Sequence, residues 1–382
     1  MIDLEKYIEI RKKIHRNPEL KYEEFDTAKL VSEHLRDLGY EVTTGIGKTG
    51  VKAVLYTNKP GPTIAFRADL DALPIIEANN FEHKSCNHGK MHACGHDGHT
   101  ASLLCAAESL MKNKESYSGN IVIIMQPAEE GGAGAKAMID DGVLENPYVD
   151  KIFGFHNRPG FDEGFVFAKS GSAMGGNDTI EINILGKGGH AAMPHMACDP
   201  IVAGANFISQ AQTIISRKLS PLNSAAITVA TFNAGKAHNV ISDHAKLILS
   251  VRSDCKPTKD LLIKEIELAI KSSCLQQGCT YQMGTLISIP ALVNHKLETK
   301  EFIQACSTVF SDGDIEEIDY MPTMGAEDFS FYLLERPGCY FFIGNGKEGA
   351  YLHNPHYDFN DAIIPVANQA YLALADYYLG KK

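Results

Sequence analysis

Apolar and polar positions along the chain follow helical spacing in some stretches and β-rich runs in others. Residues 4–38 carry apolar side chains at helical spacing, interrupted near Asn17-Pro18 and ended by Gly39, which predicts two helices. Short β-rich runs then recur, with helical stretches between them. The runs are 51–55, 63–66, 121–125 and 151–155, and the helical stretches include 101–111 and 133–140. Such alternation predicts an α/β domain with a mostly parallel sheet and helices on both faces.

The middle of the chain has a different rhythm, in which two helical stretches separate four β-rich runs. In order these are 179–185, the helix 200–219, 225–232, 246–252, the helix 259–273 and 280–283. This βαββαβ order is that of a ferredoxin-like domain. We therefore expect an inserted domain at 178–288, with the larger domain formed by 1–177 and 289–382. Its composition suits a lid that also dimerises.

Composition narrows the class of protein. The 382 residues are 44% apolar, enough for a sizeable core and for more than one domain. No apolar run approaches the ~20 residues of a membrane-spanning helix, and residues 1–6 lack a signal-peptide pattern, so we expect a cytoplasmic protein. Nine scattered cysteines are typical of reduced thiols. The formal net charge of -11, with one short basic cluster at 11–13, argues against a nucleic-acid-binding surface.

Polar clusters follow several of the β-rich runs at the point where each run ends. They are 67–71, 126–130, His156 and 344–346. Ligands of open α/β sheets bind beyond the carboxyl ends of the strands, so these side chains are expected to converge on one crevice.

Residues 83–99 concentrate imidazole and thiol groups. They are His83, Cys86, His88, His92, Cys94, His96 and His99. A structural zinc module is one interpretation, but such modules usually have two close ligand pairs separated by a spacer, which this run lacks. Cys94 and His96 can instead splay from a tight loop around Gly95, held by the helix expected to begin near Thr100.

The acidic pair Glu129-Glu130 offers two carboxylates with separate roles, because one can bind metal while the other handles protons. Alone, the pair is more typical of an exposed turn, but the following Gly131-Gly132 lets the backbone approach closely and favours function. His156 alone is more typical of a satisfied strand-end histidine. With Cys94, His96 and Glu130 it completes a set of sulfur, nitrogen and oxygen donors suited to zinc or a similar ion.

Several motifs in this order resemble the dinuclear-metal peptidases and amidohydrolases, a family that includes aminoacylase, carboxypeptidases and deacetylases. The branch they resemble most is that of hippurate hydrolase and the auxin-conjugate hydrolases. The matching stretches are 15–20, 67–74, 91–100, 126–132, 154–156, 186–190, 325–329 and 353–360. Together they extend over nearly the whole chain.

The resemblance implies two divalent metal ions, most simply zinc, with manganese, cobalt or nickel as alternatives. Cys94 would bridge them, Glu129 would be the general base, and the remaining ligands would be His96, Glu130, His156 and His353. His353 is preferred to His356 because it matches the family position.

The resemblance also assigns roles outside the ligand set. His190 would stabilise the developing oxyanion, in its own or a partner's site, while Asn239 and Arg252 would hold the substrate's α-carboxylate. A surface salt bridge is an equally good interpretation of Arg252. Many branches of the family have a histidine ligand at the position of Arg67, which offers only donors. Asp69, two residues later, would then orient a ligand histidine without binding metal.

The expected activity is hydrolysis of the amide bond of N-acyl-L-amino acids, hippurate-like or N-acetylated, by metal-activated water. Deacetylation of N-acetyl-diaminopimelate and cleavage of dipeptides are alternatives with the same chemistry. A non-catalytic metal-dependent binding protein is a remote third, because a binder needs no base beside its ligands. The expected partners are a small-molecule substrate and further copies of the chain, as a homodimer or larger homo-oligomer, without nucleic acid or membrane.

Overall fold

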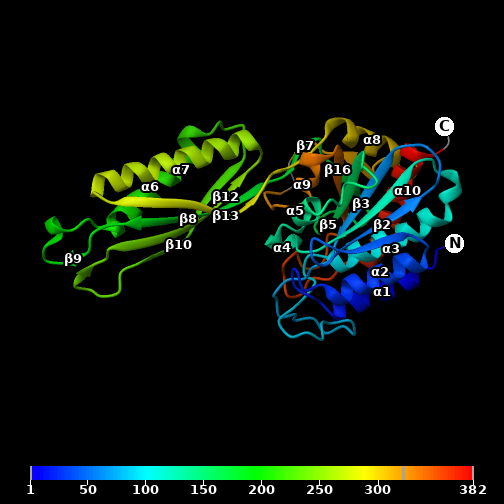
Figure 1. The fold of residues 1–382 in the computed structure, drawn as a ribbon, viewed down its shortest axis with the longest axis horizontal. Helices are drawn as coiled ribbons and strands as arrows, with labels where there is room; N and C mark the ends of the chain where they lie inside the picture. Colours follow the sequence, from blue (N-terminus) through cyan, green and yellow to red (C-terminus); the bar gives the residue numbers. More distant parts are fainter. Residues whose placement is uncertain (1, 321–322, 381–382) are drawn as a thin grey trace. The chain divides into compact units, whose positions relative to one another are not determined.

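The computed structural model describes residues 2–320 and 323–380, and its contacts divide the chain into two compact units. The first unit comprises residues 1–173 and 294–320 together with the chain from Asp328 onward. The second comprises Met174–Val293 and a short segment that ends at Glu327. Figure 1 shows both units, each with its own sheet and helices.

An eight-stranded sheet forms the centre of the first unit, in the order β1-β2-β4-β3-β5-β16-β6-β15. Its strands are β1 (Glu41–Ile46), β2 (Gly50–Tyr56), β3 (Thr63–Asp69), β4 (Asn120–Gln126), β5 (Lys151–Arg158), β6 (Val166–Ala168), β15 (Ile315–Glu317) and β16 (Gly338–Gly344). The central strands β4, β3, β5 and β16 are parallel neighbours. These strands are buried along nearly their whole length, as expected for a sheet covered on both faces.

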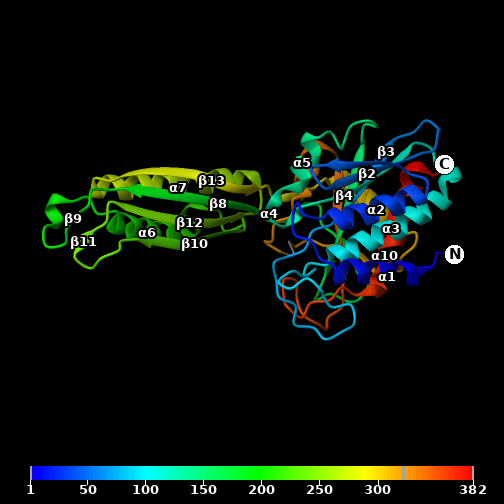
Figure 2. The ribbon, with the colours of Figure 1, turned by 60° about the horizontal axis from the view of Figure 1, so that its bottom comes forward.

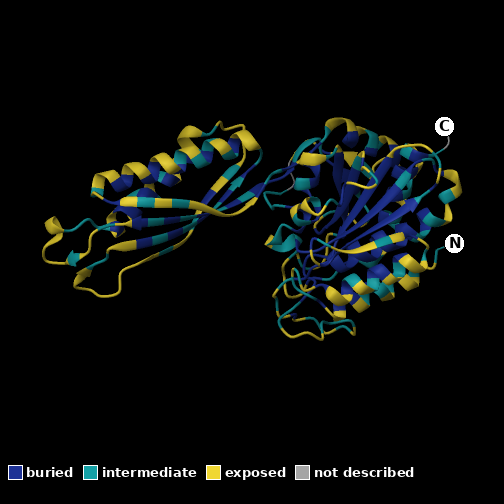
Figure 3. Cartoon of the chain, in the orientation of Figure 1, coloured by how far each residue is buried: buried dark blue, intermediate teal, exposed yellow. Residues whose placement is uncertain are grey.

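Helices cover this sheet from both faces. They are α1 (Leu4–Arg16), α2 (Phe25–Asp37), α3 (His96–Lys112), α5 (Gly134–Asp140), α8 (Lys296–Cys306), α9 (Ser330–Glu335) and α10 (Ile364–Leu379). Helices α3 and α10 pack against each other beside β3, and α5 lies on the opposite face (Figure 2). Helix α9 packs against α5. Figure 3 shows the resulting buried layer along the sheet.

The second unit has one antiparallel sheet of order β10-β12-β8-β13. Its elements are β8 (Gly176–Leu185), α6 (Pro200–Lys218), β10 (Ala225–Ala234), β12 (His244–Ser253), α7 (Lys256–Gln277) and β13 (Thr280–Ile289). Ile180, Ile182 and Ile184 alternate along β8 toward a core shared with α6 and α7. The chain therefore follows the expected βαββαβ order in this unit.

The mixed α/β architecture with a largely parallel central sheet is confirmed. The structure adds antiparallel pairing at β1-β2, at β2-β4 and at β16-β6, which the sequence did not predict. In β1, residues 41–46 are mostly exposed, so this edge strand lacks the apolar pattern that marks a buried one. Among the described residues, no helix is long and apolar enough to span a bilayer.

Candidate metal centre

Cys94 and His96 lie in the tight loop that leads into α3. Between them Gly95 has a φ of +90°, and a Cβ there would lie 2.5 Å from Asn157 Oδ1 and 2.6 Å from the Tyr357 hydroxyl. Only glycine fits this conformation and this space. The loop thus holds a thiol and an imidazole, both buried, in fixed positions two residues apart.

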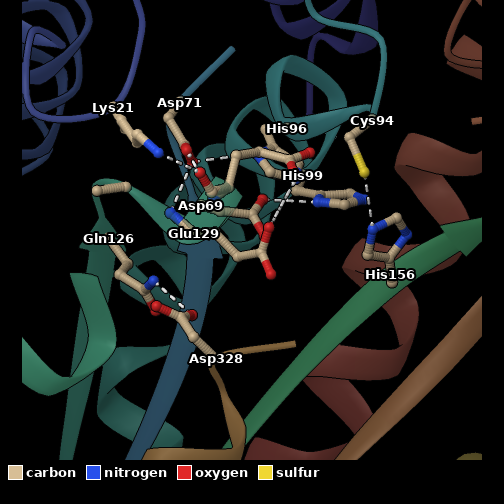
Figure 4. A network of polar contacts seen from close by, with 12 residues as sticks. Lys21, Asp69, Asp71, Cys94, His96, His99, Gln126, Glu129, His156 and Asp328 are labelled. Carbon is tan, nitrogen blue, oxygen red and sulfur yellow. Dashed lines mark hydrogen bonds and ion pairs between the residues drawn. The ribbon is translucent and has the colours of Figure 1, made fainter. Parts of the chain in front are cut away.

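The parallel strands bring further side chains to the same edge of the sheet. His156, near the end of β5, lies with its Nε2 3.4 Å from Cys94 Sγ. Asp69 ends β3, and Gln126 ends the neighbouring β4. Figure 4 shows these side chains converging from separate strands, as the strand-end rule predicts.

The backbone of residues 128–130 fixes the direction of the Glu129 and Glu130 side chains. Ala128 has a φ of +54°, and its N–H donates to Glu24 Oε1 at 2.9 Å. The N–H groups of Glu129 and Glu130 then donate to the two carboxylate oxygens of Asp71, at 3.0 and 2.9 Å. Because Asp71 holds both amides, the two glutamate side chains have a fixed origin beside His96.

His353 comes from the loop after β16 and also has an uncommon backbone, with a φ of +63°. Its N–H donates to the carbonyl of Ala93 at 2.7 Å, which ties this loop to the Cys94 loop. Its Nε2 lies 3.2 Å from Glu130 Oε1. Left-handed backbone at non-glycine residues is uncommon and concentrates at functional sites.

All five predicted ligands fall into compact groups of donor atoms, each within 4.8 Å of one another. The groups are Cys94 with His96 and His156, Cys94 with Glu130 and His353, and His96 with Glu129 and Glu130. Cys94 belongs to two groups, as a bridging ligand would. His96 Nε2 is buried without a hydrogen-bond partner, so a metal ion would satisfy it. Sulfur, nitrogen and oxygen donors in this combination fit zinc or a similar divalent ion.

Two aspartates support the ligands, and the sequence singled out only one of them. Asp69 Oδ1 lies 2.7 Å from His99 Nδ1, and Asp69 Oδ2 lies 3.8 Å from His96 Nε2. Asp71 Oδ1 lies 3.3 Å from His96 Nδ1 and is therefore the carboxylate that orients this histidine. His99 Nε2 in turn pairs with Asn157 Oδ1 at 2.8 Å.

Arg67 is a buried cation that contacts the side chains supporting the candidate metal centre. Its guanidinium donates to Gln126 Oε1 at 2.7 Å, to Asp69 Oδ2 at 2.7 Å and to Asp328 Oδ1 at 3.0 Å. Asp328 also accepts from the Ala135 N–H at 2.9 Å. Arg67 thus fixes Asp69 from behind, a supporting role that agrees with its exclusion as a ligand.

The second unit places two of its three predicted residues in one cavity. A cavity of about 840 Å³ is lined by His190, Asn239 and Lys236, among others. His190 lies on the short strand β9 (Gly189–His190), which pairs with β11 (Val240–Ile241). Arg252 is not among the lining residues, because it lies near the far end of β12 from His244. Arg252 and His244 are eight positions apart along β12, which corresponds to roughly 26 Å at the usual rise of a strand.

Comparisons with known proteins show the family to which the chain belongs. The model of peptidase family M20/M25/M40 matches residues 65–377. The chain belongs to this M20 family. It is 39% identical over 381 residues to hippurate hydrolase of Campylobacter jejuni, covering 99% of this chain and 98% of that protein. It is 40% identical over 368 residues to the putative amidohydrolase YhaA of Bacillus subtilis, covering 95% and 92%.

A solved M20 structure is similar over almost the whole chain. It is the YXEP protein of Bacillus subtilis, described as a dinuclear metal binding peptidase, with a TM-score of 0.84 and 31% identity over 97% of each chain. The M20 chain described here is accordingly an amidohydrolase of this family. Its donor groups suit two ions, since Cys94 is common to two of them.

Without metal, burial and neighbouring groups shift the pKa values of four of the proposed ligands. Burial raises the pKa of the Cys94 thiol. Hydrogen bonds to Cys94 and Glu130 raise the pKa of His353 to about 10. Burial opposes charge on His96, but Asp69 together with contacts to Cys94 and Asp71 outweighs burial and raises the pKa of His96. Burial lowers the pKa of His156 well below its usual range, which leaves this imidazole neutral. Metal binding must therefore displace protons from several ligands.

Sequence reasoning gave no individual role to Asp71 or His99 and did not single out Asn157 or Tyr357 of this M20 site. The Asn157 amide donates to the Tyr357 hydroxyl at 2.5 Å, and both pack against Gly95. The spacing of Asp69 and Asp71, two residues apart after a strand, was a local signal for a second functional carboxylate. Nothing local pointed to the contact between Asn157 and Tyr357, which are 200 residues apart.

Proposed function

We propose that the chain hydrolyses the amide bond of N-acyl-L-amino acids and that Cys94, His96, Glu130, His156 and His353 hold two divalent ions, most simply zinc. The observation that carries this proposal is the pair of donor groups that share Cys94, with Glu129 beside His96. Glu129 Oε2 lies 4.0 Å from His96 Nε2 without being needed as a ligand. A binding protein would have no use for this extra carboxylate.

The roles of the residues follow from their positions. Divalent ions held there would acidify a water molecule from a pKa of about 15.7 toward about 7 and polarise the substrate's carbonyl. Glu129 would take the proton from this water and return it to the leaving amine. His190 would donate to the oxygen on which negative charge develops, a contribution of roughly 3 kcal/mol for one well-placed donor.

Substrate recognition would fall to Asn239 and Arg252, with the α-carboxylate as their target, since a guanidinium binds a carboxylate in bidentate fashion. His190 and Asn239 line a cavity together with His244, whereas Arg252 lies roughly 26 Å from His244 along β12. A small substrate is shorter than this separation. We therefore infer that a working site combines Arg252 of one second unit with His190 and Asn239 of another, in a homodimer.

A substrate panel on metal-reconstituted protein tests this function. Hippurate and N-acetyl amino acids should be cleaved, and their amides without a free carboxylate should be poor substrates. N-acetyl-diaminopimelate and dipeptides belong in the same panel, because the same chemistry would cleave them. The proposal fails if the reconstituted protein leaves every N-acyl amino acid intact while cleaving dipeptides.

A further inference from the structure

A small cationic pocket lies on the first unit, between α2 and the turn of the β1-β2 hairpin. Its volume is about 320 Å³, at the small end for sites that bind organic molecules. One face of α2 lines it, with side chains spaced three or four residues apart, and the hairpin forms the opposite wall. The lining residues are Phe25, Ala28, Lys29, Ser32, Arg36, Thr44, Gly45, Lys48 and Thr49.

Three of the lining side chains are cationic, and among the described residues none of them forms an ion pair with a carboxylate. They are Lys29, Arg36 and Lys48; in the part of the chain that the structure describes, Arg36 donates only to Ser32 Oγ, at 3.3 Å. The chain as a whole has 47 acidic and 36 basic side chains, so carboxylates are abundant. Three positive charges that line one pocket repel one another, and a bound anion would offset this repulsion.

Two aromatic rings adjoin these charges. Phe25 is 61% exposed at the pocket, an unusual exposure for a ring of this size. Lys48 has a φ of +80° in the hairpin turn, and its ammonium lies 5.3 Å from the centre of the Tyr22 ring. The backbone therefore holds this lysine in a conformation that L residues rarely adopt, beside the Tyr22 ring.

We propose that this pocket binds a small organic phosphate or phosphonate that carries a flat apolar group, and that its occupancy tunes turnover at the metal centre. A dianion neutralises more of the three charges than a single carboxylate would. The Arg36 guanidinium can donate two parallel hydrogen bonds to the oxygens of a phosphate or phosphonate. Thr44 supplies a hydroxyl group on the opposite wall. Phe25 offers its face to the apolar part of the ligand.

A short chain of hydrogen bonds connects the pocket wall with the proposed base. Thr49 Oγ1 donates to Glu24 Oε2 at 2.6 Å, and the N–H of Ala128 donates to Glu24 Oε1 at 2.9 Å. Ala128 immediately precedes Glu129 and holds the left-handed conformation that aims it. A ligand that draws Lys48 and the hairpin toward α2 therefore acts on the segment carrying Glu129. This kinetic part rests on the proposed function, whereas binding does not.

Binding is tested by a site-resolved titration of the metal-loaded protein with phenylphosphonate and with inorganic phosphate. Backbone amide signals of Gly45 and Thr49 report the pocket, and that of Gly95 reports binding at the metals. We expect saturable shifts at Gly45 and Thr49, tighter for phenylphosphonate than for phosphate. The double variant Arg36→Gln/Lys48→Gln should bind at least about tenfold more weakly, while Lys300→Gln, an exposed lysine on α8, should bind like wild type.

Turnover of the best substrate is then measured with and without phenylphosphonate in the same three proteins. The ligand should change kcat in wild type and in Lys300→Gln, and the double variant should lose this response. Shifts confined to Gly95, or equal affinity in the double variant, would overturn the site. Binding at the pocket with no difference in kinetic response among the proteins would overturn its regulatory role. Absence of all turnover would instead count against the proposed function, since the binding result stands separately.

Discussion

Asp71 accepts a hydrogen bond of 3.0 Å from the backbone N–H of Glu129. The same carboxylate accepts from Glu130 and orients His96, so one side chain positions the proposed base and two proposed ligands. Replacement by alanine would leave both amides without their acceptor and free the segment to move. We expect Asp71→Ala to lower kcat about 10- to 100-fold, the usual cost of losing a supporting group at a metal site.

Metal analysis of the same variant separates the two effects of Asp71. If the ions stay bound while kcat falls, the loss reflects the position of Glu129. The conservative Asp71→Asn should recover part of the activity, because its amide oxygen still accepts one hydrogen bond. Unchanged kcat in Asp71→Ala would show that the backbone holds the acidic pair without it.

Glu129 and Cys94 should differ in what their loss removes. Glu129→Gln keeps the shape of the side chain but cannot take a proton, so turnover should fall by a factor on the order of 100 or more while metal content stays. Cys94→Ser should lower both, because this thiol belongs to two groups of donors. Cys86→Ala, an exposed cysteine, is the control and should behave like wild type. Full activity in Glu129→Gln would assign the base elsewhere.

The proposed composite site predicts complementation between inactive variants. His190→Ala and Glu129→Gln should each be nearly inactive alone. In a mixed dimer, the chain with an intact Glu129 receives His190 from its partner. After subunit exchange of equal amounts, about a quarter of wild-type activity should return, since half the dimers are mixed and each has one complete site. No recovery in exchanged, mixed dimers would place His190 in its own chain's site.

Metal affinity should rise with pH. In the metal-free centre His353, with a pKa of about 10, and His96, whose pKa is also raised, hold protons that a metal must displace. Raising the pH removes this competition, so the apparent Kd for zinc should fall from pH 6 to pH 8. Calorimetry in buffers of different ionisation heat would count the protons released. If zinc binding released no protons, His353 and His96 would not be protonated in the metal-free centre.

The buried pair of His15 and Asp97 should make stability depend on pH. Burial alone lowers the pKa of His15, but the charge of Asp97, 2.8 Å away, and hydrogen bonds to Asp97 and Glu77 raise it to about 9. The folded-state value exceeds the unfolded one of about 6.5, so the stabilisation is complete below that pH and disappears as the pH rises through 9. It is on the order of 3 kcal/mol.

Urea unfolding in the presence of a chelator measures this contribution without interference from metal. His15→Gln should be less stable than wild type at pH 6, and the difference should shrink at pH 10. A difference that stays constant over this range would mean that packing, rather than charge, accounts for the role of His15.

Much of the site could be predicted because each ligand adjoins a strand end or a loop with its own sequence signal. The apolar runs before Asp69, Gln126 and His156 are buried parallel strands, and their common direction brings the polar ends together. What could not be predicted depends on contacts between distant segments. Asn157 meets Tyr357 behind Gly95, and Arg67 meets Asp328, only because the whole sheet is assembled.

The edge strand β1 and the separation of Arg252 from the His190 cavity could not be predicted from local sequence. An exposed edge strand has no buried face to leave an apolar pattern, so 41–46 gave little signal. The family resemblance assigns both Arg252 and His190 to the handling of substrate, which suggests that they lie close together. Their separation follows from the register of β12 on β8, where Arg252 faces Asn177 and His244 faces Leu185.

Because Cys94 belongs to two groups of donor atoms, its oxidation would affect both groups. A thiolate is the ligand type that peroxide attacks, and conversion of Cys94 to a sulfenic acid would remove a donor from both groups at once. Burial and a raised pKa protect the metal-free thiol, since only the thiolate reacts readily. A metal ion would bind Cys94 as the thiolate, so the protection that the protonated thiol provides would be lost on metal binding. Peroxide would therefore oxidise Cys94 mainly as a metal-bound thiolate, and the buried, protonated thiol of the metal-free chain would be the more resistant form.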